Sequence, residues 1–380
     1  MKNYYTFEVG PLSHRLEVYM AILMLVAGLV FLIFGAEMLV RGASRLASSI
    51  GISPLVIGLT VVAFGTSSPE LAVSIKAALS NQANIAVGNV VGSNIFNVLF
   101  ILGLSALIVP LAVSQQLVRF DVPLMIALSV FVLFFSLDGK FGHIDGLILV
   151  AGLACYVLFL IIQSRREHLK MIKEFPEDYG TVRDIKSSWT KNVFLVIGGL
   201  ILLVFGSRWL VDSAVSFAHY LGVSELVIGL TIVAAGTSLP EVVTSVIAAI
   251  RGERDIAVGN VVGSNIFNIM GVLGIASIIS PSGIEVSSAV IRFDIPVMIV
   301  VALACLPIFF SEGVISRQEG VLLLGYYIAY TLYLILAANH HAALPTFSAV
   351  MLYFAVPLTL ITIVVVAFVE IRSRNKSLSK

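Results

Sequence analysis

Charged residues are scarce in this chain. Lysine, arginine, aspartate and glutamate make up 12% of its 380 residues, whereas a typical soluble protein has about 25%. With 59% hydrophobic residues and a mean hydropathy of +1.04, too little polar surface remains to cover a water-soluble core. The two cysteines, Cys155 and Cys305, lie within apolar segments and indicate neither a disulfide framework nor a metal site. The composition therefore excludes a soluble globular protein.

Several functional motifs are also missing. The sequence has no phosphate-binding GxxxxGK motif, which argues against an ATP-driven pump, and no HExxH metalloprotease motif. A formal net charge of +1 gives no bias towards nucleic acid. We expect no enzymatic activity, no bound cofactor, no nucleic-acid partner and no obligate protein partner.

Apolar segments of about 20 residues recur along the chain, the length that a helix needs to cross the hydrocarbon core of a bilayer. We predict an all-α polytopic membrane protein with ten transmembrane helices in two repeats and one additional helix at the C-terminal end. The predicted spans are 19–40, 55–79, 85–109, 120–137, 144–163, 192–212, 226–250, 256–279, 292–311, 318–337 and 346–369.

The spans divide the chain into an ordered series of segments. We expect an N-terminal extension (1–18), a first five-helix repeat (19–164), a cytoplasmic loop (165–190), a second five-helix repeat (191–338), the eleventh helix (346–369) and a basic tail (370–380). The extension lacks the basic region and short apolar core of a cleaved signal peptide, so we expect none.

Basic residues indicate the orientation of the chain. If the N-terminus is outside, 17 lysines and arginines fall on the cytoplasmic side and 5 fall outside. Cytoplasmic loops of membrane proteins carry the excess of positive charge. The sequence therefore predicts a multi-pass protein of the plasma (inner) membrane, with the N-terminus outside and the C-terminus in the cytoplasm.

The chain matches itself at a shift of 171 residues. LVIGLTVVAFGTSSPE (55–70) aligns with LVIGLTIVAAGTSLPE (226–241), and IAVGNVVGSNIFN occurs at both 85–97 and 256–268. These matches lie in the most similar parts of the two halves, 55–105 and 226–276, and indicate a duplication. Five spans per half is an odd number, so the second repeat enters the membrane inverted. Inverted repeats are common in secondary transporters that work by alternating access.

The first repeated motif predicts a broken helix that carries a carboxylate. Pro69 has no backbone N–H and its ring clashes with the carbonyl of Gly65, so a continuous helix is interrupted there. Carbonyl oxygens freed at the break, the hydroxyls of Thr66 and Ser67 and the carboxylate of Glu70 fall within a few residues. Such oxygens bind hard cations, and in a membrane they are tolerated where they line a cavity or hold an ion. The second copy offers Ala234, Gly236, Thr237, Ser238, Pro240 and Glu241.

The second repeated motif places polar side chains along one helix stripe. Asn89, Ser93 and Asn97 recur at intervals of four residues, as do Asn260, Ser264 and Asn268. Glycines at 88, 92, 259 and 263 permit close approach of neighbouring helices. For Asn89, Asn94, Asn260 and Asn265, hydrogen bonding between helices explains the residue type as well as ion binding does.

Other polar residues have structural interpretations. Pairs spaced four residues apart, Glu37 with Arg41 and Arg208 with Asp212, are expected to form salt bridges. Lys76 is expected to point away from Glu70. Two aspartates that each stand two residues before a proline, Asp121 and Asp294, are interpreted as helix caps.

The paired GTS-x-PE and GN-x-x-GSN-x-x-N motifs resemble the repeats of the Ca²⁺/cation antiporter superfamily, specifically its prokaryotic sodium/calcium exchangers. The resemblance covers the ten-span unit. It implies that broken helices two and seven, with helices three and eight, enclose four adjacent cation sites, and that helices one and six slide to switch access. Residue by residue, it implies Ca²⁺ ligands from Glu70, Glu241 and the carbonyls of Thr66 and Thr237. It implies Na⁺ sites from the carbonyls of Ala63 and Ala234, with Ser67, Ser93, Ser238, Ser264, Asn97 and Asn268 nearby.

The sequence departs from this family at two points. Some members carry Asp where this chain has Asn268, and in K⁺-dependent relatives that Asp is linked to potassium, so Asn argues against K⁺ transport. The eleventh helix exceeds the usual ten. The expected function is electrogenic Na⁺/Ca²⁺ antiport in the direction of Ca²⁺ extrusion; a proton-coupled exchanger of Ca²⁺ or other divalent cations, using the same glutamates, and a passive cation channel remain the alternatives.

Overall fold

The computed structural model of the chain describes residues 11–80, 83–174, 189–220, 234–310, 313–339, 341–355 and 357. Almost all of these residues are helical, and several helices contain a π-helical segment, labelled η. The elements of the first half are α1 (Pro11–Ile50), α2 (Pro54–Ile57), η1 (Gly58–Val62), α3 (Ala63–Thr66), α4 (Ser68–Leu79), α5 (Ala83–Phe96), η2 (Asn97–Leu102), α6 (Gly103–Ile108), β1 (Leu111–Ala112), η3 (Leu117–Asp121), α7 (Val122–Phe135), β2 (Lys140–Phe141) and α8 (His143–Glu174).

The second half repeats this order. Its elements are α10 (Trp189–Tyr220), α12 (Ala234–Gly236), α13 (Leu239–Ile250), α14 (Arg254–Phe267), η6 (Asn268–Leu273), α15 (Gly274–Ile279), β3 (Ile284–Glu285), η7 (Val290–Asp294), α16 (Ile295–Phe310), β4 (Val314–Ile315) and α17 (Arg317–Ala338), followed by α18 (Leu344–Val350) and η8 (Met351–Ala355). The short strands pair antiparallel between the halves, β1 with β4 and β2 with β3. The polytopic helical fold and its two repeats are confirmed.

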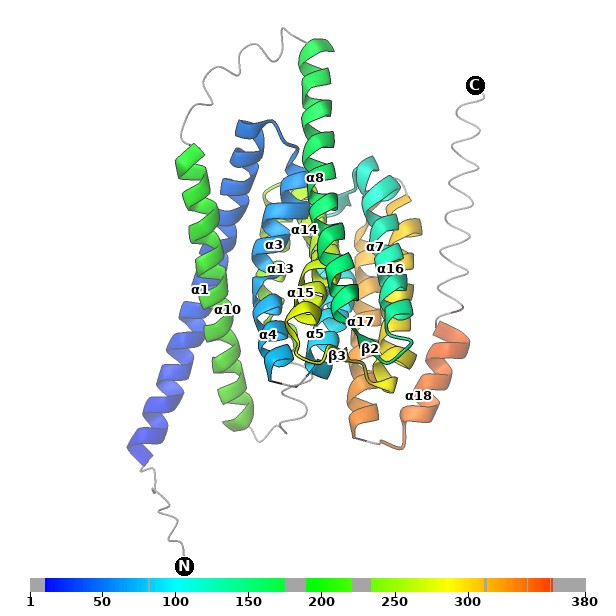
Figure 1. Cartoon of the computed structure of the whole chain (residues 1–380). Coiled ribbons are helices and arrows are strands. Elements are labelled where there is room, and N and C mark those ends of the chain that lie inside the picture. The colour runs from blue at the N-terminus through cyan, green and yellow to red at the C-terminus, as the bar shows by residue number, and fades with distance from the viewer. Residues whose placement is uncertain are drawn as a thin grey trace, which may run out of the picture.

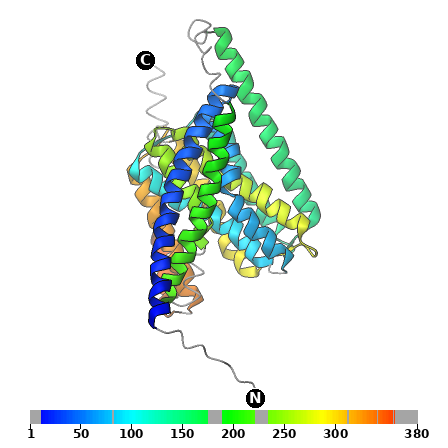
Figure 2. The same cartoon turned by 90° about the vertical axis from the view of Figure 1, so that its left-hand side faces the viewer.

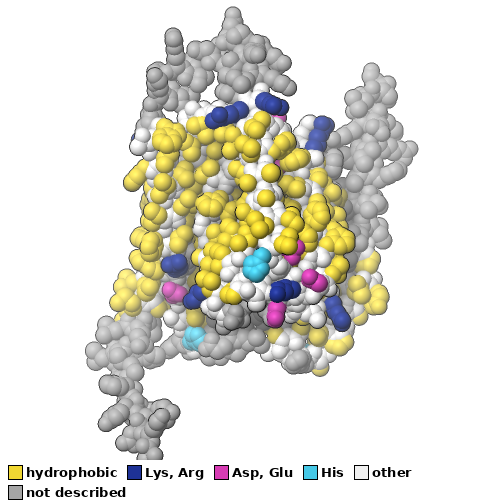
Figure 3. Space-filling model, in the orientation of Figure 1, with side chains coloured by type: hydrophobic (Ala, Val, Ile, Leu, Met, Phe, Trp, Pro, Cys, Tyr) yellow, Lys and Arg dark blue, Asp and Glu magenta, His cyan; other side chains and the backbone are white. Residues whose placement is uncertain are grey.

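Eight helices of the described residues are long and apolar enough to cross a membrane, and the bent pair Pro54–Thr66 and Ser68–Leu79 makes a ninth. The face shown in Figure 3 has a broad apolar band, with charged side chains mainly towards its two ends. The expected count of ten plus one is not established by these spans. The first part of the predicted span 226–250 and most of 346–369 lie outside the described residues.

The helices α1 and α10 lie side by side along one flank of the molecule (Figures 1 and 2). A Cβ atom on Gly35 would stand 2.8 Å from the carbonyl oxygen of Gly199, and one on Gly28 would stand 2.9 Å from that of Gly206. Residue numbers rise along α1 as they fall along α10, so the two helices are antiparallel. Because they occupy equivalent places in the two repeats, the repeats are inverted as predicted.

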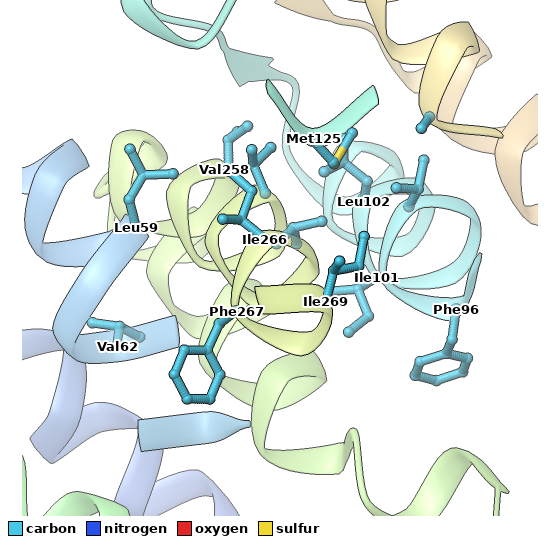
Figure 4. Packing of buried hydrophobic residues seen from close by; sticks show 14 of the residues in the cluster. Leu59, Val62, Phe96, Ile101, Leu102, Met125, Val258, Ile266, Phe267 and Ile269 are labelled. Carbon is cyan, nitrogen blue, oxygen red and sulfur yellow. The ribbon is translucent and has the colours of Figure 1, made fainter. Parts of the chain in front are cut away.

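The helices that carry the repeated motifs form the centre of the molecule. Buried residues make up 83% of the most apolar stretch of the span Arg254–Ile279 and 72% of that of Ile85–Ile108. The corresponding share in α17 is 6%. In the close view, η1 packs against α14 through Leu59 and Val62, with Ile101 of η2 on the opposite side of α14 (Figure 4). A Cβ on Gly263 would lie 2.7 Å from the Leu59 backbone, so this glycine permits the contact between α14 and η1. The residues of the second half that correspond to Leu59 and Leu55 lie outside the described part of the chain.

One of the two predicted salt bridges is present. Glu37 pairs with Arg41, and it also accepts a hydrogen bond of 2.9 Å from Nε of Arg251 at the end of α13. Between Arg208 and Asp212, which are both described, the structure contains no ion pair, so that prediction was wrong. Lys76 is exposed.

The interpretation of Asp121 and Asp294 as helix caps was also wrong. Neither carboxylate caps a helix of the described chain; each accepts a hydrogen bond of 2.9 Å from a tyrosine hydroxyl instead, Asp121 from Tyr156 and Asp294 from Tyr330. A buried carboxylate needs a donor, and the tyrosine on the neighbouring membrane helix supplies it. The pattern before proline could not reveal a partner 35 residues away.

We expect Tyr156→Phe to destabilise the protein more than Tyr330→Phe. Asp121 is fully buried whereas Asp294 is partly exposed, so only the first carboxylate loses a donor that water cannot replace, at a cost of about 1–3 kcal/mol. Thermal denaturation of the purified variants in detergent measures this difference. Equal losses of stability would show that the two Asp–Tyr pairs are equivalent despite their different burial.

Candidate functional site

Both copies of the first motif contain a break at the same residue. In the first half α3 ends at Thr66, Ser67 takes φ −80° and ψ 8°, and α4 begins at Ser68 with a bend of 46°. In the second half Ser238 takes φ −89° and ψ 9° before α13 begins. Pro69 stands in the first turn of α4, where its missing N–H does least harm. The predicted helix break is therefore confirmed, and it is short: Ser67 separates the helices of the first half, and Thr237 and Ser238 separate those of the second.

The two glutamates are buried at the centre and held by the opposite repeats. Glu70 is fully buried and Glu241 is 1% exposed. Ser238 donates a hydrogen bond of 2.7 Å to Oε1 of Glu70, and Ser67 donates one of 2.9 Å to Oε1 of Glu241. Each serine thus binds the carboxylate of the other half. This arrangement brings the two repeated motifs together into one site.

Several buried oxygen atoms of the motifs have no hydrogen-bond partner among the described residues. They are Oε2 of Glu70, Oε2 of Glu241, Oδ1 of Asn97, Oδ1 of Asn268, the hydroxyl of Thr237 and the hydroxyl of Ser264. Leaving a buried acceptor unpaired costs about 1–3 kcal/mol, and more for a charged group. Unpaired carboxylate, hydroxyl and amide oxygens are atoms of the kind that bind a hard cation.

The remaining predicted residues also fall near the breaks, with different partners. Thr66 is buried and its hydroxyl donates to Oδ1 of Asn260 at 3.1 Å, and the carbonyl of Ala63 accepts the N–H of Ser67 at 3.0 Å. Ser93 is 4% exposed, with its hydroxyl 3.4 Å from that of Ser238. Ala234 begins α12, and its side chain lies outside the described part.

Asparagines of the second motif brace the glutamates rather than face them. Nδ2 of Asn89 donates to the backbone carbonyl of Glu70 at 3.1 Å and to Ser74 at 3.0 Å. Asn260 makes the equivalent bonds to Glu241 and Ser245, at 3.4 and 2.9 Å. Their amides are used in structural hydrogen bonds, which agrees with the structural interpretation of these two residues. The serines at 74 and 245 were not singled out from the sequence, although their four-residue spacing from the glutamates was a usable signal.

Among the described residues, the two repeated motifs contribute two buried carboxylates, Glu70 and Glu241. No group of three or more His, Cys, Asp or Glu side chains occurs in the part of the chain that the structure describes. Two carboxylates surrounded by hydroxyl, amide and carbonyl oxygens suit Na⁺ and Ca²⁺ better than a transition metal, which prefers nitrogen and sulfur. The geometry brings the two carboxylates and the polar side chains of both inverted repeats together at one place.

Comparison with known proteins identifies the family. The profile of the family described as sodium/calcium exchanger protein matches residues 20–162 and 191–336, which together are most of the chain and leave out α18. The chain belongs to the sodium/calcium exchanger family. It is thus a multi-pass membrane protein of a family of cation antiporters, as the motifs indicated.

Relatives of this exchanger family align over nearly their whole length. The chain is 39% identical over 320 residues to the putative antiporter CaxA of Alkalimonas amylolytica, with 82% of this chain and 97% of the relative covered. It is 36% identical over 340 residues to the sodium/calcium exchanger MaX1 of Methanosarcina acetivorans, covering 81% and 96%. The fold is similar to that of the sodium-calcium exchanger NCX_Mj in crystals soaked with Na⁺ and Sr²⁺, with a TM-score of 0.70, 31% identity and coverage of 82% of this chain and 97% of that one.

Proposed function

We propose that this exchanger family member moves Ca²⁺ out of the cell in exchange for Na⁺ by alternating access. The observation that carries the proposal is the pair of buried glutamates, each bound by the serine of the other repeat and each with one free oxygen. The relatives named as sodium/calcium exchangers support the choice of ions. The proposed ligands are the two glutamates, the carbonyls of Ala63, Ala234, Thr66 and Thr237, and the side chains of Ser67, Ser238, Ser93, Ser264, Asn97 and Asn268.

The charge of the site explains how the exchange is driven. Two ionised glutamates give the empty site a charge near −2, one Ca²⁺ neutralises it, and three Na⁺ leave it at +1. A cycle that alternates between the two loaded states moves one net charge across the membrane, and each 100 mV of membrane potential then contributes about 2.3 kcal/mol. With the N-terminus outside and the C-terminus in the cytoplasm of the plasma (inner) membrane, this potential favours Na⁺ entry and Ca²⁺ exit.

The inverted packing supports alternating access. The antiparallel pair α1 and α10 contacts the broken helices on one side: a Cβ on Gly65 would clash with a methyl group of Leu200 on α10. Ser207 of α10 donates a hydrogen bond of 2.7 Å to the carbonyl of Gly236, next to the second break. Sliding of the α1–α10 pair along these contacts exposes the site first to one side of the membrane and then to the other.

The proposal is tested by radiolabelled Ca²⁺ uptake into Na⁺-loaded proteoliposomes. We expect uptake to require the outward Na⁺ gradient. We also expect it to increase when valinomycin and K⁺ make the interior positive, because one net positive charge leaves the vesicle for each Ca²⁺ that enters. Uptake that a pH gradient drives equally well without Na⁺ would assign the protein to proton-coupled exchange. Ca²⁺ flux that needs no counter-ion at all would indicate a passive channel.

A further inference from the structure

Two asparagines of the site have their amide nitrogens bound and their oxygens free. Nδ2 of Asn97 donates to Oδ1 of Asn265 at 3.0 Å, and Nδ2 of Asn268 donates to Oδ1 of Asn94 at 3.1 Å. Oδ1 of Asn97 and Oδ1 of Asn268 are buried without a hydrogen-bond partner in the described structure. Each bond joins the two repeats, because one asparagine of each pair lies in the first half and the other in the second.

The amide orientations of Asn94 and Asn265, here called the outer asparagines, follow from their own hydrogen-bond partners. Nδ2 of Asn94 faces the backbone carbonyl of Asn265 at 3.2 Å and the sulfur of Met298 at 3.7 Å. Nδ2 of Asn265 faces the sulfur of Met125 at 3.3 Å. A carbonyl and a thioether only accept hydrogen bonds, so an amide nitrogen must face them and the amide oxygen must face the other way.

The outer asparagines in turn determine the amide orientations of Asn97 and Asn268, the inner asparagines. Because Asn94 presents an oxygen to Asn268, the amide of Asn268 must present its nitrogen in return, and its own oxygen is left free. The same holds for Asn265 and Asn97. A carboxamide would otherwise place its nitrogen and oxygen in either of two positions related by a half-turn of the terminal torsion.

The free oxygens lie on the helix stripe that carries the cation-site residues. Asn97 follows Ser93 by four residues, and the hydroxyl of Ser93 is 3.4 Å from the hydroxyl of Ser238 that binds Glu70. Asn268 follows Ser264 by the same interval. Both asparagines are also the first residues of π-helical segments, η2 and η6, a feature that is frequent at functional sites.

We propose that Asn94 and Asn265 are positioning residues of the cation site, which orient Asn268 and Asn97 so that both present a carbonyl oxygen, and never an amide N–H, to the bound ion. This inference rests on the proposed function, because it assigns a role at the site for the transported cations. It also differs from a purely structural role, because Asn94 and Asn265 determine whether the amide oxygen or the amide nitrogen of Asn268 and Asn97 faces the cation. Loss of the orienting oxygen allows the amide to turn its NH₂ group towards the cation.

The test is a double-mutant cycle on equilibrium Ca²⁺ binding to the full-length protein in detergent. Asn94→Leu removes the oxygen that orients Asn268 while keeping a similar side-chain shape, and Asn268→Ala removes the ligand itself. We expect each variant to weaken binding about tenfold or more, as substitutions behind a metal ligand commonly do. We expect the double variant to bind no more weakly than Asn268→Ala, because Asn94 acts only through Asn268.

Two further variants separate orientation from packing. Asn94→Asp keeps an oxygen facing Asn268. When protonated it also keeps an O–H donor for the Asn265 carbonyl, and when ionised it adds a negative charge near the cation. We expect it to bind Ca²⁺ at least as well as the unaltered protein; weakening as large as that of Asn94→Leu would overturn the proposal in favour of a packing role. The pair Asn94→Leu and Ser67→Ala, whose original side chains share no hydrogen-bond partner in the described part of the chain, serves as the matched control, and the free-energy changes of its two substitutions are expected to add.

The outcomes separate this inference from the proposed function. Two outcomes would overturn the inference while Na⁺/Ca²⁺ exchange still stood. One is a double variant whose fold loss of Ca²⁺ affinity equals the product of the losses caused by Asn94→Leu and Asn268→Ala. The other is unchanged Ca²⁺ binding by a folded Asn94→Leu protein. Ca²⁺ binding with the expected non-additivity, but without Na⁺-dependent transport, would retain the inference and reject the coupling. Absence of Ca²⁺ binding by the unaltered protein would reject both. Melting curves and size-exclusion profiles establish that each variant is folded, and Asn265→Leu with Asn97→Ala repeats the cycle in the other half.

Discussion

Glu70→Gln is expected to reduce Na⁺-dependent Ca²⁺ uptake by about 100-fold or more. The substitution keeps the side-chain shape and an oxygen for the Ser238 hydrogen bond, but it removes one of the two negative charges of the proposed Ca²⁺ site. Loss of one partner of a buried charge pair costs about 3–5 kcal/mol, and each 1.4 kcal/mol is a factor of ten in binding. Glu241→Gln is expected to have an effect of the same size, because the inverted repeat gives the two carboxylates equivalent surroundings.

The chain offers a matched control for this substitution. Glu285 lies exposed on β3, which pairs with β2, and Glu285→Gln changes the same functional group. Its Ca²⁺ uptake is expected to equal that of the unaltered protein in the same proteoliposome assay. Retention of more than a tenth of the uptake by both site variants would contradict the assignment of the glutamates as the principal ligands.

Gly35→Ala is expected to destabilise the protein and to suppress transport. The new methyl group would lie 2.8 Å from the carbonyl oxygen of Gly199 and 2.9 Å from the backbone nitrogen of Leu203. Backbone atoms cannot rotate out of the way, so α1 and α10 must separate. Overpacking of this kind costs about 1–3 kcal/mol, and the altered spacing also disturbs the contacts of α10 with the broken helices.

The control substitution is expected to change the stability of the protein in the opposite direction. Gly325 is an exposed position of α17 where a Cβ meets no described atom within 4 Å. Alanine there gains about 0.5–1 kcal/mol in helix stability relative to glycine. We therefore expect the melting temperature in detergent to fall for Gly35→Ala and Gly199→Ala, and to stay or rise for Gly325→Ala. A Gly35→Ala protein as stable and active as the control would show that the close contact of α1 with α10 is not required.

These two predictions concern different steps of the proposed cycle. The glutamate variants remove proposed cation ligands and are expected to act on binding, whereas the glycine variants alter the helix pair proposed to slide between access states. Measurement of Ca²⁺ binding alongside transport distinguishes them. We expect Glu70→Gln to lose both, and a folded fraction of Gly35→Ala to retain binding while it loses transport.

Much of the site was predictable because the chain contains it twice. The spacing of Pro69 and Glu70 after a Gly-Thr-Ser sequence predicts a helix break beside a carboxylate, from local stereochemistry alone. The duplication places the same motif in both halves of the chain. The odd number of spans in each half implied that the two copies have inverted orientations. The interpretation of Asp121 as a cap was wrong because its partner, Tyr156, lies on another helix, and local spacing carries no information on such contacts.

The sequence by itself determined the membrane environment, the two inverted repeats and the identity of the broken helices, because these follow from hydropathy, counting and local backbone geometry. Only the tertiary structure decided which serine binds which glutamate, since Ser67 and Glu241 are 174 residues apart, and Ser238 and Glu70 are 168 apart. It also decided that Asn97 and Asn268 keep free oxygens while Asn89 and Asn260 brace the backbone. All four are identical residue types in one repeated motif. Their different roles arise from the helices that the inverted packing places against them.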